Sequence, residues 1–382
     1  MLSALNFIKP GRKVIFMLLL FIIYNQEINK GCTMKNKLKH LVPVLLALAT
    51  ITGSLSACEL KPKAQQKVSK QGFYFDTIIQ ITLYGTTDEK YIDGCFDMAK
   101  KYEDMLSNTV SYSEVSKIND AAGKEYVTVS DDTLELIKKG MEYGDTSDGR
   151  FDITIGKLSD LWNFSEIAEN TDSKDNEVDA SVVPSDAQIQ SELSHVNYRN
   201  IQINGNDVML TDSKAKLDLG GIAKGFIADK MKAYLQSKKI TSGIINLGGN
   251  VLTVGEKSDG SDYTVGIQKP FDESGEPICT VKIKDKSVVT SGIYERYYRV
   301  DGKLYHHILD TTTGYPVKNN LYSVTIISDS SCDGDALSTT CFALGIDKAK
   351  ELINSLSGVE AIFVTDDYSI ITTSDEYSVS TE

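Results

Sequence analysis

The stretch Asp335-Ala-Leu-Ser-Thr-Thr combines a carboxylate with hydroxyl groups three and four residues later, directly before the apolar run CFALG. If a helix starts here, Asp335, Ser338 and Thr339 lie on one side of its first turn. In one interpretation, Asp335 caps the helix by accepting backbone N–H groups. In the other, the carboxylate, the hydroxyls and a backbone oxygen form a site for a hard cation. Taken alone, the pattern favours the cap.

Four other stretches are rich in glycine or in polar residues. In one of them, Gly220 and Gly221 precede a predicted helix, so their backbone groups can face a ligand. The spacing matches neither G-x-G-x-x-G nor a phosphate-binding P-loop, and a glycine-rich turn alone is more often structural. The four stretches are GRFDITIG (149–156), LDLGGIAKGFIADK (217–230), INLGGNV (245–251) and YHHILDTTTGYPV (305–317).

Two of the four histidines of the chain are adjacent, at His306 and His307, and Asp310 follows them before a turn. A lone histidine is usually a satisfied polar residue. A His-His-x-x-Asp cluster is a better candidate for catalysis, because it places a proton acceptor beside a carboxylate.

The elements that must position these residues alternate irregularly between helix and strand. The helical spacing of apolar residues predicts helices, and runs of β-branched and aromatic residues predict strands. Because no βαβ rhythm is present, the pattern predicts an α+β fold with a largely antiparallel sheet. The predicted helices span 89–106, 131–146, 222–237, 335–345 and 347–356, the predicted strands include 72–85, 200–211, 243–255, 263–268, 278–284, 294–300, 321–328, 360–366 and 368–374, and 165–187 is expected to be a surface loop.

The composition excludes some functions. The 382 residues include 40 basic and 53 acidic ones, for a formal net charge of -13, without basic clusters. This balance argues against nucleic-acid binding. To bind an anionic cofactor, this acidic chain would need positive charge at the site, from a metal, a helix N-terminus or a few lysines. The six cysteines contain no C-x-x-C pair, so their spacing suggests no zinc site.

The first sixty residues are expected to be a targeting segment. A leader-like segment begins at Met34 with three lysines, continues with an apolar stretch and ends in Leu-Ser-Ala-Cys58. This end resembles the lipobox of bacterial lipoproteins, which predicts lipidation of Cys58 and a membrane anchor facing outside the cytoplasm; an ordinary signal peptide with an incidental cysteine is the alternative. The predicted division is a non-native upstream extension (1–33), a signal peptide (34–57), a lipid-anchored tether (58–71) and one domain (72–382).

Together, six motifs resemble the bacterial ApbE family, the FAD:protein FMN transferases. They are FDIT, LDLGGIAKGF, NLGGN, SGIYERYY, HHILDTTTGYPV and DALSTT, and they occur in the order and spacing of that family. The resemblance implies a T-fold-like α+β domain with an FAD-binding cleft and Mg²⁺. It also implies cleavage of the FAD pyrophosphate, transfer of FMN to a Thr or Ser hydroxyl of a target redox protein, and release of AMP.

The resemblance also assigns residues. Asp335, Ser338, Thr339 and the backbone of Gly221 correspond to the metal ligands. His307 corresponds to a histidine just before the hydrophobic-Asp-x-x-Thr-Gly turn of the family, and we hypothesise that it helps to deprotonate the acceptor hydroxyl or orients the pyrophosphate. The sequence departs from the family at Phe75-Asp76-Thr77, where many relatives have Met-Gly-Thr, and the position of Lys224 varies between Lys and Glu. The positions that correspond to FAD contacts are Phe75, Thr109, Arg150, Phe151, Asp152, Asp218, Lys224 and Leu309.

Two alternatives use the same motifs. With water as the acceptor, the site would act as an FAD pyrophosphatase that yields FMN and AMP. A non-catalytic flavin-binding lipoprotein would have little need for metal ligands. A solute-binding lipoprotein would require two lobes with parallel βαβ units, which the pattern does not predict.

Overall fold

The computed structural model describes residues 66–382, except 172–175, 258, 273, 375–378 and 381–382. The predicted extension (1–33), the signal peptide (34–57) and Cys58 therefore lie outside the described residues. Within the described part, no helix is long and apolar enough to span a bilayer.

The predicted tether (58–71) is wrong for its last five residues, because strand β1 (Lys67–Tyr74) already begins there. Along β1, exposed and partly buried residues alternate, and Val68 packs against the core. Such alternation is typical of a strand with one solvated face, and the polar residues of that face made the segment look like a linker. The exposed residues at this end of the strand are Lys67, Ser69 and Gln71.

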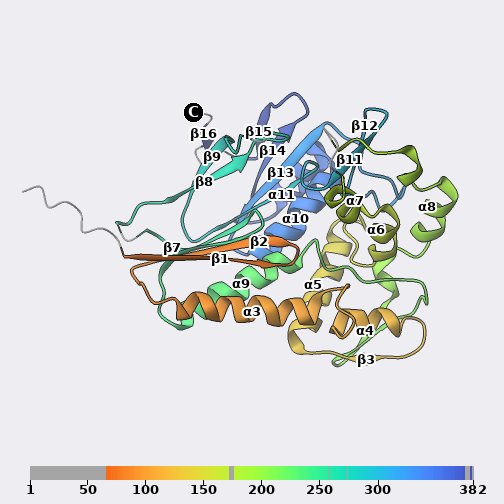
Figure 1. Cartoon of the computed structure of the whole chain (residues 1–382), viewed down its shortest axis with the longest axis horizontal. Helices are drawn as coiled ribbons and strands as arrows, with labels where there is room; N and C mark the ends of the chain where they lie inside the picture. The colour runs from red at the N-terminus through yellow and green to blue at the C-terminus, as the bar shows by residue number, and fades with distance from the viewer. Residues whose placement is uncertain (1–65, 172–175, 258, 273, 375–378, 381–382) are drawn as a thin grey trace, which may run out of the picture. The chain divides into compact units, whose positions relative to one another are not determined.

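An eight-stranded sheet forms the centre of the domain (Figure 1), and every neighbouring pair in it is antiparallel. This confirms the predicted α+β class with a largely antiparallel sheet. In spatial order, the strands are β1, β2 (Thr77–Tyr84), β6 (Ser242–Leu247), β7 (Asn250–Gly255), β10 (Ser287–Gly292), β13 (Leu321–Ser328), β14 (Glu360–Thr365) and β15 (Ile370–Thr372).

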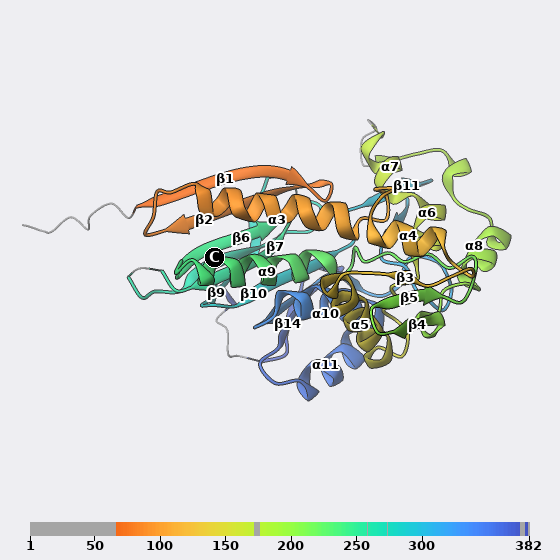
Figure 2. The same ribbon diagram turned by 90° about the horizontal axis from the view of Figure 1, so that it is seen from below.

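The two faces of this sheet bury different side chains. Ile245 and Ile326 belong to the main core beneath the helices, whereas their neighbours Ile244 and Ile327 pack in a second cluster on the opposite face. The helices α3 (Lys90–Leu106), α9 (Ala223–Ser237), α10 (Ser331–Leu344) and α11 (Ile346–Ser355) cover the first face, and β8 (Tyr263–Gln268), β9 (Pro277–Ile283) and β16 (Val379–Ser380) cover the second (Figures 1 and 2).

A third cluster forms around Trp162, whose ring stacks on Phe164 at 5.5 Å. Tyr298 and Tyr305 complete its aromatic centre. The predicted loop 165–187 is partly helical here, because Ile167 and Val178 also pack against this cluster. The remaining elements are α4 (Glu114–Asp120), β3 (Val127–Thr128), α5 (Asp131–Thr146), α6 (Gly156–Trp162), α7 (Phe164–Glu169), α8 (Asp186–Leu193), β4 (Ile201–Asn204), β5 (Asp207–Leu210), β11 (Tyr297–Val300), β12 (Lys303–His306) and short 3₁₀ turns at 180–182 and 198–200.

Helices α9 and α10 approach each other closely enough to exclude a side chain at Gly225. A Cβ atom there would lie 2.1 Å from the backbone oxygen of Ser331. One turn further along α9, Asp229 accepts hydrogen bonds from the backbone N–H groups of Ser331 and Cys332, both at 2.9 Å. Together with the N-cap Ser330, this carboxylate satisfies the first N–H groups of α10.

We predict that Gly225→Ala lowers the free energy of unfolding by about 1–3 kcal/mol, because the backbone of α10 must move to accommodate the new methyl group. Urea unfolding of both proteins measures the difference. Gly94→Ala in α3 is the comparison, because the three atoms nearest to its Cβ would all belong to the Tyr234 side chain, with the hydroxyl at 2.1 Å, whereas those nearest to the Cβ at Gly225 belong to backbone. Equal stability of the two variants would contradict the predicted tight contact between the helices.

Candidate active site

Asp335 lies in the second turn of α10 and is only 4% exposed. Its Oδ2 accepts a hydrogen bond from the backbone N–H of Gly225 at 2.9 Å. Its Oδ1 lies 3.7 Å from Nζ of Lys224. The helix begins four residues earlier with Ser330 as its N-cap, so the interpretation of Asp335 as a cap is wrong. The carboxylate instead joins α10 to the start of α9.

The two predicted hydroxyl ligands lie beside Asp335 and face β10. Ser338 is fully buried, and its Oγ lies 2.9 Å from the backbone oxygen of Asp335 and 2.7 Å from Oγ of Ser291. The hydroxyl of Thr339 lies 3.1 Å from the same Ser291 oxygen. The three residues therefore follow one another along one side of α10, and their role as metal ligands stays a prediction.

The glycine turn before α9 forms the neighbouring wall. Gly221 packs closely on the ring of Phe151, since a Cβ atom would lie 3.1 Å from that ring. Asp218 Oδ1 accepts the backbone N–H of Gly220 at 2.8 Å and so shapes the turn. Lys224 Nζ lies 3.4 Å from the carbonyl oxygen of Gly220. The ammonium group of Lys224 thus lies between the carbonyl oxygen of Gly220 and Oδ1 of Asp335.

The FDIT stretch joins this turn to the histidine motif. Arg150 donates to Asp310 Oδ1 at 2.8 Å, across 160 residues of sequence. Asp152 is buried, which raises its pKa, and its two oxygens accept hydrogen bonds from Thr154 and Tyr198. Asp310 braces the turn that follows it, and Asp152 braces its own loop, so both aspartates position neighbouring groups.

His307 is half-buried, and its backbone N–H and its Nδ1 both face the carbonyl oxygen of Arg296, at 3.1 and 3.2 Å. Burial, followed by the nearby Arg296 guanidinium, lowers the pKa of His307 to about 3. The imidazole is therefore neutral near pH 7. Because Nδ1 faces an acceptor, it carries the proton, and Nε2 keeps a lone pair that can accept another.

Glu295 belongs to the same charged cluster. The residue is exposed at the edge of the cluster, and the protein groups around its carboxyl still raise its pKa to about 7 through loss of hydration; the Asp335 charge adds to this effect, whereas Lys224 and Arg296 oppose it. The sequence prediction assigned no role to Ser291, Glu295 or Arg296. All three lie in the SGIYERYY motif, and their polarity within an otherwise apolar and aromatic stretch was the available signal.

Three residues predicted to contact FAD make their contacts in the structure with other parts of the protein, and not with the residues around Asp335. Phe75 forms the β1–β2 turn at a φ of 56°, and its N–H donates to Glu103. Thr109 is exposed, and its hydroxyl lies 2.9 Å from Oγ of Ser107. Leu309 is buried in the aromatic cluster around Trp162. The role of each of these residues toward FAD stays a prediction.

The donor set around Asp335 suits a hard cation that keeps other ligands. Among the described residues, no group of three or more His, Cys, Asp or Glu side chains forms a metal cage. Mg²⁺ commonly takes one or two carboxylates and completes its shell with waters and substrate phosphates. A single buried carboxylate beside hydroxyl and carbonyl oxygens fits this pattern.

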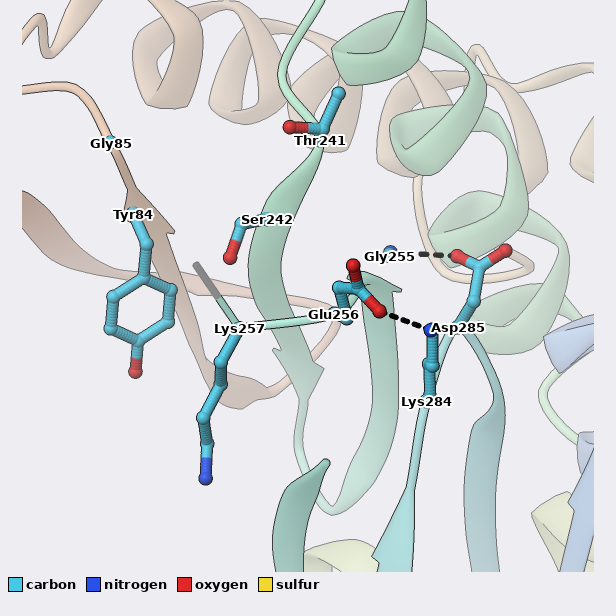
Figure 3. A pocket seen from close by; sticks show the side chains of 9 residues that line it. All are labelled: Tyr84, Gly85, Thr241, Ser242, Gly255, Glu256, Lys257, Lys284 and Asp285. Atoms are coloured by element: carbon cyan, nitrogen blue, oxygen red, sulfur yellow. Dashed lines mark hydrogen bonds and ion pairs between the residues drawn. The ribbon is translucent and has the colours of Figure 1, made fainter. Parts of the chain in front are cut away.

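A separate hollow of about 530 Å³ lies at the far ends of β2, β6 and β9, away from these motifs (Figure 3). Its charged groups already have partners in the protein. Glu256 pairs with Lys284, and Asp285 pairs with Lys232 at 2.8 Å and accepts the N–H of Gly255 at 2.7 Å. None of the predicted site residues lines this hollow.

Comparisons with known proteins agree with the motif pattern. A sequence model of the ApbE family matches residues 75–363. The chain belongs to the ApbE family. An FAD:protein FMN transferase of Klebsiella pneumoniae is 38% identical over 298 residues, which cover 78% of this chain and 88% of that protein. A second transferase, from Treponema pallidum, is 31% identical over 291 residues, or 72% of this chain and 77% of that one.

Solved structures of the ApbE family share the fold. The ApbE protein of Thermotoga maritima superimposes with a TM-score of 0.72 at 31% identity, over 80% of this chain and 96% of that one. The flavin transferase ApbE of Vibrio cholerae gives a TM-score of 0.69 at 25% identity, over 83% and 98% of the two chains. The arrangement of helices on a mostly antiparallel sheet is therefore that of the family.

We predict that Glu295→Gln becomes more stable relative to wild type as the pH rises from 5 to 8. In the folded protein, the pKa of Glu295 is raised from 4.5 to about 7, so the unfolded chain loses this proton first and unfolding becomes easier across that window. Glutamine has no such titration. Urea unfolding in EDTA at pH 5, 6.5 and 8 measures the difference, and a pH-independent difference would contradict the assignment.

Proposed function

We propose that this protein is an FAD:protein FMN transferase. The observation that carries the proposal is the convergence of several family motifs on one cluster: Asp335 contacts Gly225 and Lys224, and the charge of Lys224 acts on both Glu295 and His307. Family membership and the relatives named as FAD:protein FMN transferases support it. FAD is the substrate, and a redox protein with a Thr or Ser acceptor is the partner.

We assign a Mg²⁺ site to Asp335, Ser338, Thr339 and the backbone of Gly221. The fit rests on their oxygen chemistry and on the Oδ1 of Asp335, whose contact among the described residues is a distant one with Lys224, at 3.7 Å. When bound there, Mg²⁺ would neutralise charge on the pyrophosphate and on the phosphorus centre. Lys224 and Arg150 are the positively charged side chains that would bind the phosphates of FAD.

The transfer exchanges one phosphorus–oxygen bond for another. The acceptor hydroxyl oxygen attacks the phosphorus of the FMN half of FAD and forms a phosphoester bond. The bond from that phosphorus to the bridging oxygen breaks, and AMP leaves with the bridging oxygen and the electron pair. As the new bond forms, the attacking hydroxyl becomes strongly acidic, so its proton can pass even to an imidazole of low pKa; Nε2 of His307 takes it, because its lone pair is free while Nδ1 faces the Arg296 carbonyl.

The location of the protein is also a proposal. The lipobox-like Leu55-Ser-Ala-Cys58 supports lipidation of Cys58 after cleavage of a signal peptide. We infer that the domain is anchored to the cell membrane and faces outside the cytoplasm. There, it would modify redox proteins whose acceptor residue is exposed on the same side.

We predict that Asp335→Asn lowers the rate of FMN transfer by about 100-fold or more, because the cation loses its only charged ligand. The assay measures, by intact mass, the addition of one FMN to an acceptor protein in the presence of FAD and Mg²⁺. Asp333→Asn is the matched control in the same helix, since Asp333 pairs instead with Lys139 at 3.0 Å and Tyr143 at 2.7 Å.

Two results of this assay would contradict the proposal. Equal rates for Asp335→Asn and Asp333→Asn would remove the carboxylate from the reaction. Release of free FMN and AMP without any labelled acceptor would show a pyrophosphatase instead of a transferase.

We predict that His307→Ala lowers the transfer rate by about 100-fold, since positioned acid–base groups commonly contribute 10²–10⁴-fold. FAD binding, followed by flavin fluorescence, should change much less, because the side chain acts on the acceptor hydroxyl. A variant that keeps the full transfer rate would show that His307 is not the base.

A further inference from the structure

Lys224 occupies an unusual position for a positive charge. It lies in the first turn of the 15-residue helix α9, where the helix dipole disfavours cations. Its Nζ lies 3.4 Å from the carbonyl oxygen of Gly220 and 3.7 Å from Oδ1 of Asp335. The ammonium group is therefore flanked by oxygens from the glycine turn and from α10, the two elements to which we assign the metal ligands.

Lys224 lies beside the oxygen of Asp335 to which a divalent cation would bind. Asp335 is buried, and the Gly225 N–H engages its Oδ2. In the described part of the chain, the one ion pair of Asp335 is with Lys224. A divalent cation at Oδ1 would lie next to the ammonium group, and two positive charges at such a distance repel strongly in a partly buried site. Both cannot remain at Asp335 without a large electrostatic cost.

Lys224 also has room to move. Its side chain is 30% exposed, and both of its polar contacts exceed 3.3 Å, so neither is a short, strong hydrogen bond. The long flexible stem of lysine allows the ammonium group to turn away from Asp335 at little cost. An anionic phosphate bound beside Asp335 would offer it a stronger partner than a distant carboxylate.

We propose that, in the metal-free protein, the ammonium group of Lys224 neutralises the Asp335 carboxylate in place of the metal, and that it moves to the substrate pyrophosphate when Mg²⁺ binds. The inference rests on the Mg²⁺ site assigned above. Because the metal frees the lysine for phosphate, and phosphate draws the lysine away from Asp335, each ligand strengthens the binding of the other. Lys224 is thus a positioning residue that couples metal binding to FAD binding.

The test measures Mg²⁺ binding without FAD, by calorimetry at constant ionic strength, for wild type and Lys224→Met. Methionine keeps the approximate length of the side chain and removes its charge. The variant should bind Mg²⁺ about tenfold more tightly, an effect within the range usual for coupled sites. Lys230→Met is the matched control in the same helix, because Lys230 pairs with Asp132 at 3.0 Å and Glu135 at 2.8 Å. That control should bind Mg²⁺ as wild type does.

A second readout follows FAD by flavin fluorescence, in EDTA and in saturating Mg²⁺. Magnesium should strengthen FAD binding by a larger factor in wild type than in Lys224→Met, since only wild type has a lysine to release. Unchanged or weaker Mg²⁺ binding by Lys224→Met would overturn the inference and identify Lys224 as a fixed partner of Asp335.

Asp335→Asn separates this failure from failure of the proposed metal site. If wild type binds Mg²⁺ no more tightly than Asp335→Asn does, the metal assignment itself is wrong and the inference falls with it. If binding depends on Asp335 but not on the charge of Lys224, only the inference is overturned.

Discussion

The close contact between α9 and α10 is the constraint on which the site depends. Gly225 lets the two backbones approach, and its N–H then fixes the Asp335 carboxylate at 2.9 Å. One turn away, Asp229 holds the first N–H groups of α10. A carboxylate in this interior needs such partners, because an unpaired buried charge is costly. The packing of two helices thereby determines where the charge of the site lies.

The sheet brings the other groups to this carboxylate. Strand β10 carries Ser291 against α10, and the chain that follows it supplies Glu295 and Arg296. The Arg150–Asp310 pair ties the FDIT loop to the histidine turn. The chain as a whole is acidic, yet Lys224 and Arg296 both lie close enough to Glu295 to oppose the rise of its pKa. That local reversal of charge suits an anionic substrate such as a pyrophosphate.

The sequence predicted most helices, because the spacing of apolar residues in a helix depends on neighbours only a few positions apart. The order of the predicted helices and strands then gave the fold class. It misplaced the start of α10, since the cap Ser330 and the distant Asp229 determine that boundary. It missed β1 before residue 72, since the exposed residues of that face are polar. The contacts of Arg150 and the raised pKa of Glu295 arise from residues far apart in the chain, which spacing alone does not reveal.

The most direct test of the central claim is a crystal structure of the protein with Mn²⁺ and FAD, with diffraction collected at the manganese absorption edge. We expect an anomalous peak within about 2.3 Å of an Asp335 oxygen, with the pyrophosphate bound beside it. A manganese peak remote from α10, or a pyrophosphate bound away from Asp335, would contradict the proposed active site.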